Sequence, residues 1–355
     1  MGTVIQSIFI PFFFLSISYF FTVGSEEFLV YKDIARLFYI SVFLLYFLVN
    51  RKQINWNSYV LYFLTIILLA LVYAVNGSPI VINLIVVTFF TIYLKSRNVS
   101  QESLLLSLYF AYLAALTLFL TYVLLSGNLF ASVTIGDRER YYFGFVNPNK
   151  LGITCYTLIV MTVMLQWHHL LEKKTVILML CSLFTLVILS DSRTAILCSV
   201  IFVYLVYSKL LRRSIAVGAL LPVLFLVLSI SLSHAYGGKL DAFVSNRLSQ
   251  YYYLISQMTV EDYIFGRSIQ GIAVDNSYLQ LYFGLGLILY LMLSVYVFLK
   301  YLCINIYINQ VFVFSTLIYG LFEGVLVRPE LLIAVIFYYV LSYSDARKAL
   351  SWIKI

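Results

Sequence analysis

Long uninterrupted apolar stretches constrain this chain more than any other feature of its sequence. Each is close to the length that crosses about 30 Å of hydrocarbon at about 1.5 Å per helical residue. Their apolar residues are continuous rather than alternating, so they predict membrane helices and exclude the strands of a membrane barrel. The stretches are 4–23, 34–49, 58–76, 79–94, 103–126, 151–170, 174–190, 194–211, 214–233, 277–299, 308–327 and 329–344.

The composition agrees with this interpretation, because 63% of the 355 residues are hydrophobic and only 11% are charged. Soluble domains do not have this balance. We therefore expect an all-α, polytopic membrane protein with about twelve transmembrane helices in a single membrane domain. Its parts are 1–126 (N-terminal helices), 127–150 (an outer loop), 151–233 (helices six to nine), 234–276 (a large outer loop with an amphipathic helix) and 277–355 (helices ten to twelve).

Three details of this helix assignment are less direct. No Lys or Arg precedes Lys32 and no clear cleavage site follows the first stretch, so we expect an uncleaved helix rather than a signal peptide. Only a short turn at 76–79 divides the stretches within 58–94, and only Arg328-Pro329-Glu330 divides those within 308–344. The number of helices is open at these two places.

Basic residues predict the orientation of the chain. If the N-terminus is cytoplasmic, every even loop carries Lys or Arg, as the positive-inside rule requires, and both termini are inside. The basic residues concerned are Arg51, Lys52, Lys95, Arg97, Lys173, Lys174, Lys209, Arg212, Arg213, Lys300, Arg347 and Lys348. The net charge of +8 is scattered over short loops, which argues against a nucleic-acid partner.

The outer loop at 127–150 carries the densest group of polar residues. Arg138 and Arg140 can each bind phosphate or carboxylate oxygens through a forked guanidinium. Asn147 and Asn149 flank a proline, in a turn whose amides can hydrogen-bond a polar ligand. The loop therefore predicts a ligand that is anionic and hydroxylated.

A second outer motif, Ser190-Asp191-Ser192-Arg193-Thr194, joins two apolar stretches. An arginine at such a boundary needs a partner. Arg193 could bind phosphate, with Ser192 beside it, or it could contact Asp191 or a lipid headgroup, and the sequence leaves both alternatives open.

The large loop at 234–276 predicts an amphipathic helix at the membrane interface, with Arg247 on its polar side. Asp275 precedes the next helix, either as its N-cap or as a catalytic base. The apolar side of the predicted amphipathic helix consists of Leu240, Phe243, Val244, Leu248, Tyr251 and Ile255.

The last polar groups of interest are Glu323 and Arg328. We expect Glu323 in the outer half of the eleventh helix and Arg328 at its end, either as functional groups or as an internal ion pair. The four cysteines and three histidines show no metal-ligand spacing, so no metal or cofactor is expected. No phosphate-binding loop of the GxxxxGK[ST] type occurs, so a reaction here needs a substrate that is already activated, or a gradient.

Taken in order, these motifs resemble the Wzy-type O-antigen and capsular polysaccharide polymerases, a superfamily that includes the O-antigen ligases. The resemblance spans roughly residues 130 to 330. The chain departs from the family in having Asp275 where a histidine is frequent, which leaves Asp275, His234 and Glu323 as candidate bases and favours a polymerase over a ligase. The matching residues are Arg138 or Arg140, Gly144, Asn147, Pro148, Asn149, Ser190, Ser192, Arg193, Arg247, Phe265, Gly266, Asn276, Ser277, Tyr278 and Glu323.

The resemblance implies transfer of a growing glycan from undecaprenyl diphosphate to an incoming lipid-linked oligosaccharide, at the outer face of a bacterial cytoplasmic membrane. Partners would be this lipid-linked substrate, membrane lipids and, as candidates, a chain-length regulator and a flippase. A ligase or a lipid-linked oligosaccharide flippase are the alternatives, although the sequence has no clear internal repeat of the kind seen in transporters. The implied diphosphate and sugar ligands are Arg193, Arg247, Arg138, Arg140, Asn147, Asn149 and Asn276, with Ser192, Tyr278 and Arg328 completing the predicted site.

Overall fold

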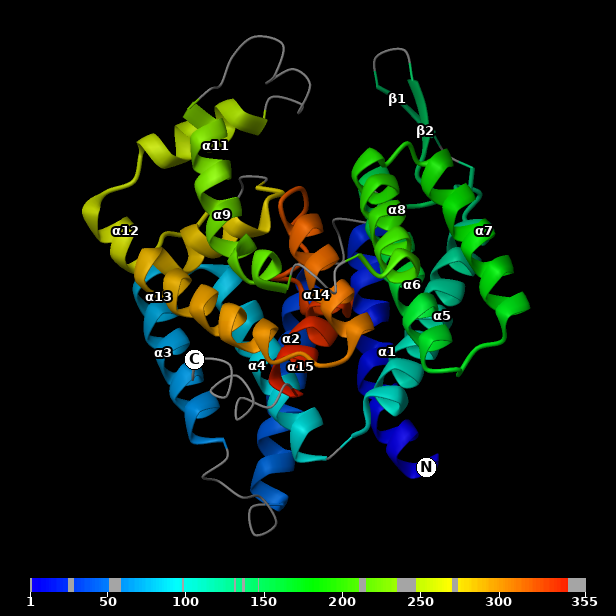
Figure 1. Cartoon of the computed structure of the whole chain (residues 1–355), viewed down its shortest axis with the longest axis horizontal. Coiled ribbons are helices and arrows are strands. Elements are labelled where there is room, and N and C mark those ends of the chain that lie inside the picture. Colours follow the sequence, from blue (N-terminus) through cyan, green and yellow to red (C-terminus); the bar gives the residue numbers. More distant parts are fainter. Residues whose placement is uncertain are drawn as a thin grey trace. The chain divides into compact units, whose positions relative to one another are not determined.

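The structure, a computed structural model, describes residues 2–24, 29–50, 59–97, 99–130, 132–135, 138–145, 147–210, 215–234, 247–269 and 274–343. Each predicted apolar stretch contains a helix (Figure 1). These helices are α1 (Gly2–Gly24), α2 (Leu29–Val49), α3 (Val60–Asn76), α4 (Pro79–Ser96), α5 (Gln101–Leu125), α6 (Pro148–Trp167), α7 (Lys173–Leu189), α8 (Arg193–Ser208), α9 (Ile215–His234), α13 (Ser277–Leu302), α14 (Tyr307–Gly320) and α15 (Ile333–Tyr343).

The prediction of an all-α membrane protein agrees with the apolar helices of the structure. Among the described residues, four helices are long and apolar enough to cross a membrane, namely α4, α5, α6 and α13, and several shorter apolar helices accompany them. The total of twelve crossings stays a prediction.

Local signals explain where several helices begin. Ser100 caps α5 by accepting a hydrogen bond from the backbone N–H of Ser103 at 3.2 Å. Asn147 caps α6 in the same way, and Pro148 occupies the first turn, where its missing N–H costs nothing. These short polar residues satisfy N–H groups that have no partner inside the helix.

The chain forms two compact units, which we describe separately. Unit 1 comprises residues 1–54, 89–209 and 330–336, and unit 2 comprises 55–88, 210–329 and 337–355.

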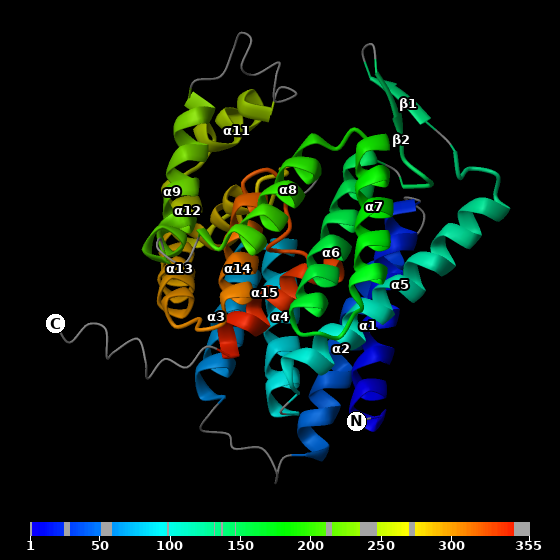
Figure 2. The same cartoon turned by 45° about the vertical axis from the view of Figure 1, so that its right-hand side comes forward.

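In unit 1, helix α1 packs on α5, and α6 packs on α5, α7 and α8 (Figures 1 and 2). The buried Phe20 ring lies between Tyr112 and Phe119 of α5, at centroid distances of 4.9 and 5.8 Å. Helices α6 and α8 approach closely because Gly152 has no side chain, and a Cβ there would collide with Ser192. This contact positions the start of α8.

In unit 2, helix α13 packs on α9 and α12 (Figures 1 and 2). The hydroxyl of Tyr278 donates to the Leu317 carbonyl and that of Tyr290 to the Pro222 carbonyl, each at 2.6 Å. Burying these tyrosines is therefore possible because each hydroxyl has a backbone acceptor.

The prediction that the eleventh helix continues to residue 327 is wrong. Helix α14 ends at Gly320, and a non-helical segment with a single 3-10 turn, η4 (Pro329–Leu331), precedes α15. Glu323 and Arg328 therefore lie in this segment and not in a helix. The reason is a tertiary contact: the Ser277 hydroxyl donates to Glu323 O at 2.7 Å and accepts from Leu326 N at 3.2 Å, which replaces helical hydrogen bonds.

The segments predicted as outer loops contain three further elements. The predicted amphipathic helix is present as α11 (Arg247–Ser256), with Leu248, Tyr251 and Ile255 buried as expected, while its earlier residues lie outside the described part of the chain. A short helix, α12 (Val260–Phe265), follows with a capping box between Thr259 and Asp262. A hairpin of β1 (Ser132–Ile135) and β2 (Arg138–Tyr141) pairs Val133 with Arg140, and the sequence analysis did not predict it.

Candidate functional site

An ion pair between Arg247 and Asp275 is the centre of the candidate site in unit 2. Arg247 Nη2 lies 2.7 Å from Asp275 Oδ2, and both side chains are about one quarter exposed, at 27% and 28%. Arg247 begins α11 and Asp275 directly precedes α13. Arg247 Nη1 also donates to the carbonyl of Phe322 at 3.4 Å, so this one guanidinium joins three segments. Charge-assisted contacts of this kind are among the stronger hydrogen bonds in proteins.

Tyr251 and Glu323 complete a group that we call the Arg247 cluster (Arg247, Tyr251, Asp275 and Glu323). Both are buried, with exposed fractions of 5% and 3%. Burial raises the pKa of Tyr251 to about 12; the Arg247 guanidinium opposes this rise, and the Asp275 and Glu323 carboxylates add to it. The Tyr251 hydroxyl therefore keeps its proton at neutral pH.

Asn276, and not Asp275, is the N-cap of α13, so the capping role, one of the two alternatives for Asp275, is wrong. Asn276 Oδ1 accepts from the backbone N–H groups of Tyr278 and Leu279, and its Nδ2 donates to Ser229 Oγ at 2.8 Å. Asn276 is also 96% buried, with 4% of its surface exposed. Its amide is thus engaged within the protein, and the side chain of Asp275 is free of the capping role.

Arg140 is the centre of the candidate site in unit 1. Its Nε donates to Ser190 O at 3.1 Å, and its Nη2 donates to Asn149 Oδ1 at 3.0 Å and to Asp191 O at 3.1 Å. The Asp191 carboxylate lies 4.0 Å away. Because these carbonyls follow the end of α7, the guanidinium also lies where a helix favours positive charge. Arg140 therefore connects β2 to the start of α6 and to the corner between α7 and α8.

Arg193 differs from Arg140 in having an exposed side chain at the first turn of α8. Within the part of the chain that the structure describes, its guanidinium has no hydrogen bond or ion pair. Its neighbour Ser192 is buried against Gly152. Of the residues in this motif, Arg193 is the one whose charge is available to a ligand.

The remaining predicted site residues are not gathered into either group. Tyr278 is buried, and its hydroxyl donates to a carbonyl of α14. Arg328 is half-buried, and the side chain of Arg138 lies outside the described residues. Asn147 is exposed but uses Oδ1 to accept from Asn149 N at 2.8 Å. His234 contacts Ile230 O and the ring of Tyr252.

Sequence reasoning assigned Tyr251 to the apolar side of its helix and missed its place in the cluster. A signal was present, since Tyr251 is four residues after Arg247 and such residues face the same side of a helix. The hairpin also had a signal in the sequence, because the dipeptide Gly136-Asp137 is of a kind that two-residue hairpin loops use.

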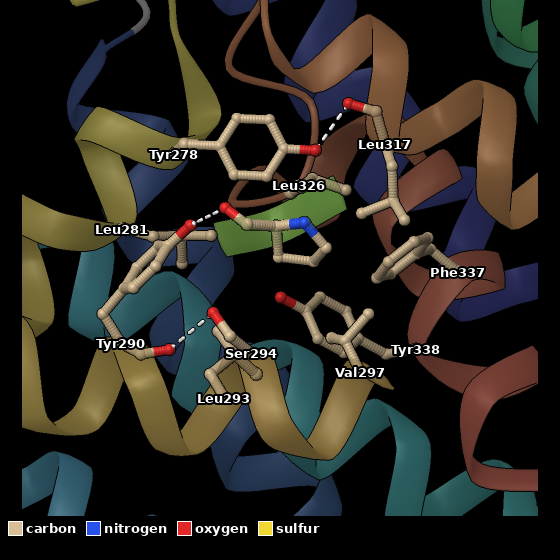
Figure 3. Close-up of a pocket in the computed structure, with 11 residues that line it drawn as sticks. Tyr278, Leu281, Tyr290, Leu293, Ser294, Val297, Leu317, Leu326, Phe337 and Tyr338 are labelled. Carbon is tan, nitrogen blue, oxygen red and sulfur yellow. Dashed lines mark hydrogen bonds between the residues drawn. The ribbon is translucent and has the colours of Figure 1, made fainter. Parts of the chain in front are cut away.

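Unit 2 also contains a small cavity between α9, α13, α14 and α15 (Figure 3). Tyr278 and Tyr290 line it but use their hydroxyl protons on backbone carbonyls. Leu281, Leu293 and Phe337 supply apolar walls. The cavity is thus an apolar space and is unsuited to hold a charged ligand.

No protein-family model matches the chain, and no curated protein or solved structure matches it.

Proposed function

We propose that this protein is a polysaccharide polymerase that transfers a growing glycan from undecaprenyl diphosphate to an incoming lipid-linked oligosaccharide, at the outer face of a bacterial cytoplasmic membrane. The observation that carries the proposal is the Arg247 cluster. It combines a cation, two carboxylates and a protonated phenol in a protein of apolar helices. Such a set can bind an anion and accept a proton within one site.

In the proposed reaction, the acceptor sugar hydroxyl attacks the anomeric carbon of the donor glycan. The bond from that carbon to the diphosphate oxygen breaks, and its electron pair leaves with undecaprenyl diphosphate. Arg247 stabilises the charge that develops on this leaving group, because a guanidinium group binds phosphate oxygens through two N–H groups. Arg193 is a separate candidate for binding a phosphate group, because its side chain is exposed. The proton of the acceptor hydroxyl passes to a carboxylate.

Asp275 is the carboxylate that we propose as the base. Its Oδ2 contacts Arg247, and its side chain is partly exposed, so Oδ1 can accept from an incoming hydroxyl. Glu323 is more deeply buried and is held through its backbone carbonyl by Ser277. Glu323 then acts as the second catalytic group of the proposal by increasing the negative charge near the acceptor proton.

One observation favours a second candidate, a flippase for the same lipid-linked substrate. Helix α13 is interrupted at Gly286, and the largely buried segment between α14 and α15 is not α-helical. Interrupted helices are common in transporters, where they form binding sites within the membrane. A ligase, which would move a finished polymer from its lipid carrier, is the third alternative.

The decisive experiment is to measure the length and lipid linkage of surface glycan in a strain that lacks this protein. The strain is complemented with wild type, Arg193→Ala, Arg247→Ala or Asp275→Asn. The matched control is Arg267→Ala, since Arg267 is an arginine of the same outer loop that bonds to Gln257 O instead of the cluster.

A polymerase predicts that wild type and Arg267→Ala restore a ladder of glycan lengths, whereas the other variants leave exported single repeats. Long polymer that stays on its lipid carrier in the deletion strain would instead identify a ligase. Accumulation of repeats on the cytoplasmic side would identify a flippase and would remove the proposed site.

A further inference from the structure

The interruption of α13 exposes backbone groups that need partners. Gly286 has φ 71° and ψ 173°, which is incompatible with a continuous helix. Carbonyls before such a break lose their helical N–H partners, and within a membrane protein this loss must be compensated. Two partners come from outside the helix: Arg267 N donates to Phe283 O at 2.6 Å, and Asn76 Nδ2 donates to Gly284 O at 2.9 Å.

Asn76 uses its whole amide in this contact. Besides Gly284 O, its Nδ2 donates to Phe265 O at 2.8 Å, and its Oδ1 accepts from Ser78 N at 2.9 Å. A side-chain amide has two N–H donors, and both are engaged here. Asn76 thereby ties the turn between α3 and α4 to the end of α12 and to the break in α13.

Two glycines allow these backbones to approach each other. Gly266 and Gly286 have φ of 76° and 71°, a conformation that other residues rarely adopt. A Cβ on Gly266 would collide with the backbone at Phe283, and a Cβ on Gly286 with the backbone at Ile264. The segment after α12 is therefore packed directly on the break, at the place where Asn76 bonds both.

The short first half of α13, before Gly286, carries the proposed reaction groups. Asp275 precedes it, and its first residue, Ser277, holds the carbonyl of Glu323. This half-helix is attached at its start through the Arg247 cluster and at its end through Asn76.

We propose that Asn76 is a positioning residue that holds the first half of α13, and with it Asp275 and Glu323, in the geometry of the reaction. The inference rests on the proposed function for its catalytic consequence. Its structural part, the attachment of α12 to the break, can be tested without any activity.

The structural test measures the distance between spin labels on Val260 of α12 and Ile288 in the second half of α13, both of which are exposed. Double electron–electron resonance is recorded for full-length protein in detergent, with Asn76, Asn76→Ala or Asn76→Asp. Asn76→Asp keeps an acceptor for Ser78 N, removes the two donated bonds and places a carboxylate oxygen next to the two carbonyl oxygens. The control is Asn83→Ala, because Asn83 is a buried asparagine whose side-chain oxygen accepts no hydrogen bond from the described residues.

We expect one narrow distance distribution for wild type and Asn83→Ala, and a broadened or shifted one for both Asn76 variants. If Asn76→Ala is not recovered in folded form, Asn76→Asp decides the result. Unchanged distances in the Asn76 variants would overturn the proposal.

The activity test measures polymerisation by purified protein as a function of pH. We expect kcat to fall by up to about 100-fold in Asn76→Ala, as small displacements of reacting groups can produce, and the shape of the pH profile to change. A change in shape is expected because the groups around Asp275, namely Arg247, Tyr251 and Glu323, alter their spacing.

Partial unfolding would lower the rate at every pH and leave the shape unaltered, so an unaltered shape would refute the positioning role. If wild-type protein has no polymerising activity, the proposed function fails, and the label distances still decide whether Asn76 holds α12 to the break.

Discussion

At the scale of single residues, three of the arginines that the sequence analysis presents as equivalent phosphate ligands have different roles. Arg140 is engaged by backbone carbonyls, Arg247 by a carboxylate, and Arg193 is exposed. Only the last can meet a ligand without giving up a protein contact. Substitutions at these positions should therefore separate stability from activity.

Removing the Arg247 and Asp275 side chains should show that the two are coupled. We expect Arg247→Ala and Asp275→Ala each to destabilise the protein, and the double variant to cost less than their sum by about 1 to 2 kcal/mol, the range of a charge-assisted hydrogen bond at a partly exposed site. Unfolding of the purified variants in denaturant provides the measurement. Strict additivity would mean that the pair contributes nothing to the folded state.

The raised pKa of Tyr251 predicts that the stability of the protein depends on pH. Its pKa is about 12 in the folded protein, against about 10 in an unfolded chain. Because the pKa is higher in the folded state, the contribution of the protonated Tyr251 hydroxyl to the free energy of unfolding is complete below a pH of about 10. This contribution is lost as the pH rises from about 10 to about 12. As the pH rises from about 10 to about 12, the stability of Tyr251→Phe should therefore fall less than that of wild type. Parallel pH curves of the unfolding midpoint for both proteins would contradict the shift.

At the scale of elements, the corner between α7 and α8 depends on the hairpin strand β2. Asp191 at this corner has a positive φ of 46°, which costs energy for any residue other than glycine. The bonds from Arg140 to Ser190 O and Asp191 O offset that cost. The hairpin is thus part of the support for the first turn of α8.

Arg140→Lys should weaken this corner, because one ammonium cannot replace a guanidinium that donates to three acceptors. We expect a loss of about 1 to 2 kcal/mol and faster cleavage of the hairpin in limited proteolysis. Arg193→Lys is the matched control and should leave both measurements near wild type. Equal effects of the two variants would show that Arg140 is not the stabilising contact.

At the scale of the whole molecule, the basic loops predict an orientation in the membrane that can be tested directly. Position 253, in the predicted outer loop, and position 172, in a predicted inner loop, are both exposed. In a background without native cysteines, Tyr253→Cys should react with a membrane-impermeant maleimide on intact cells. Glu172→Cys should react only after the membrane is opened, and the reverse pattern would invert the topology.

The sequence by itself determined the helices and the class of the protein, since apolar length and end signals act locally. Every apolar stretch contains a helix, and the residues at the starts of α5 and α6 cap them as short polar residues do. The buried side of α11 was also predictable from spacing alone. For the candidate site, the sequence identified Arg247, Asp275 and Glu323 as polar groups of interest.

Only the tertiary structure decided which of these groups meet. Arg247 and Asp275 lie at the starts of different helical segments of the chain, and Asn76 bonds carbonyls 189 and 208 residues away. The early end of α14 depends likewise on a hydroxyl from α13. In the last two cases a side chain bonds a backbone group that would otherwise bond within a helix, and in all three the partner is one that no local pattern contains.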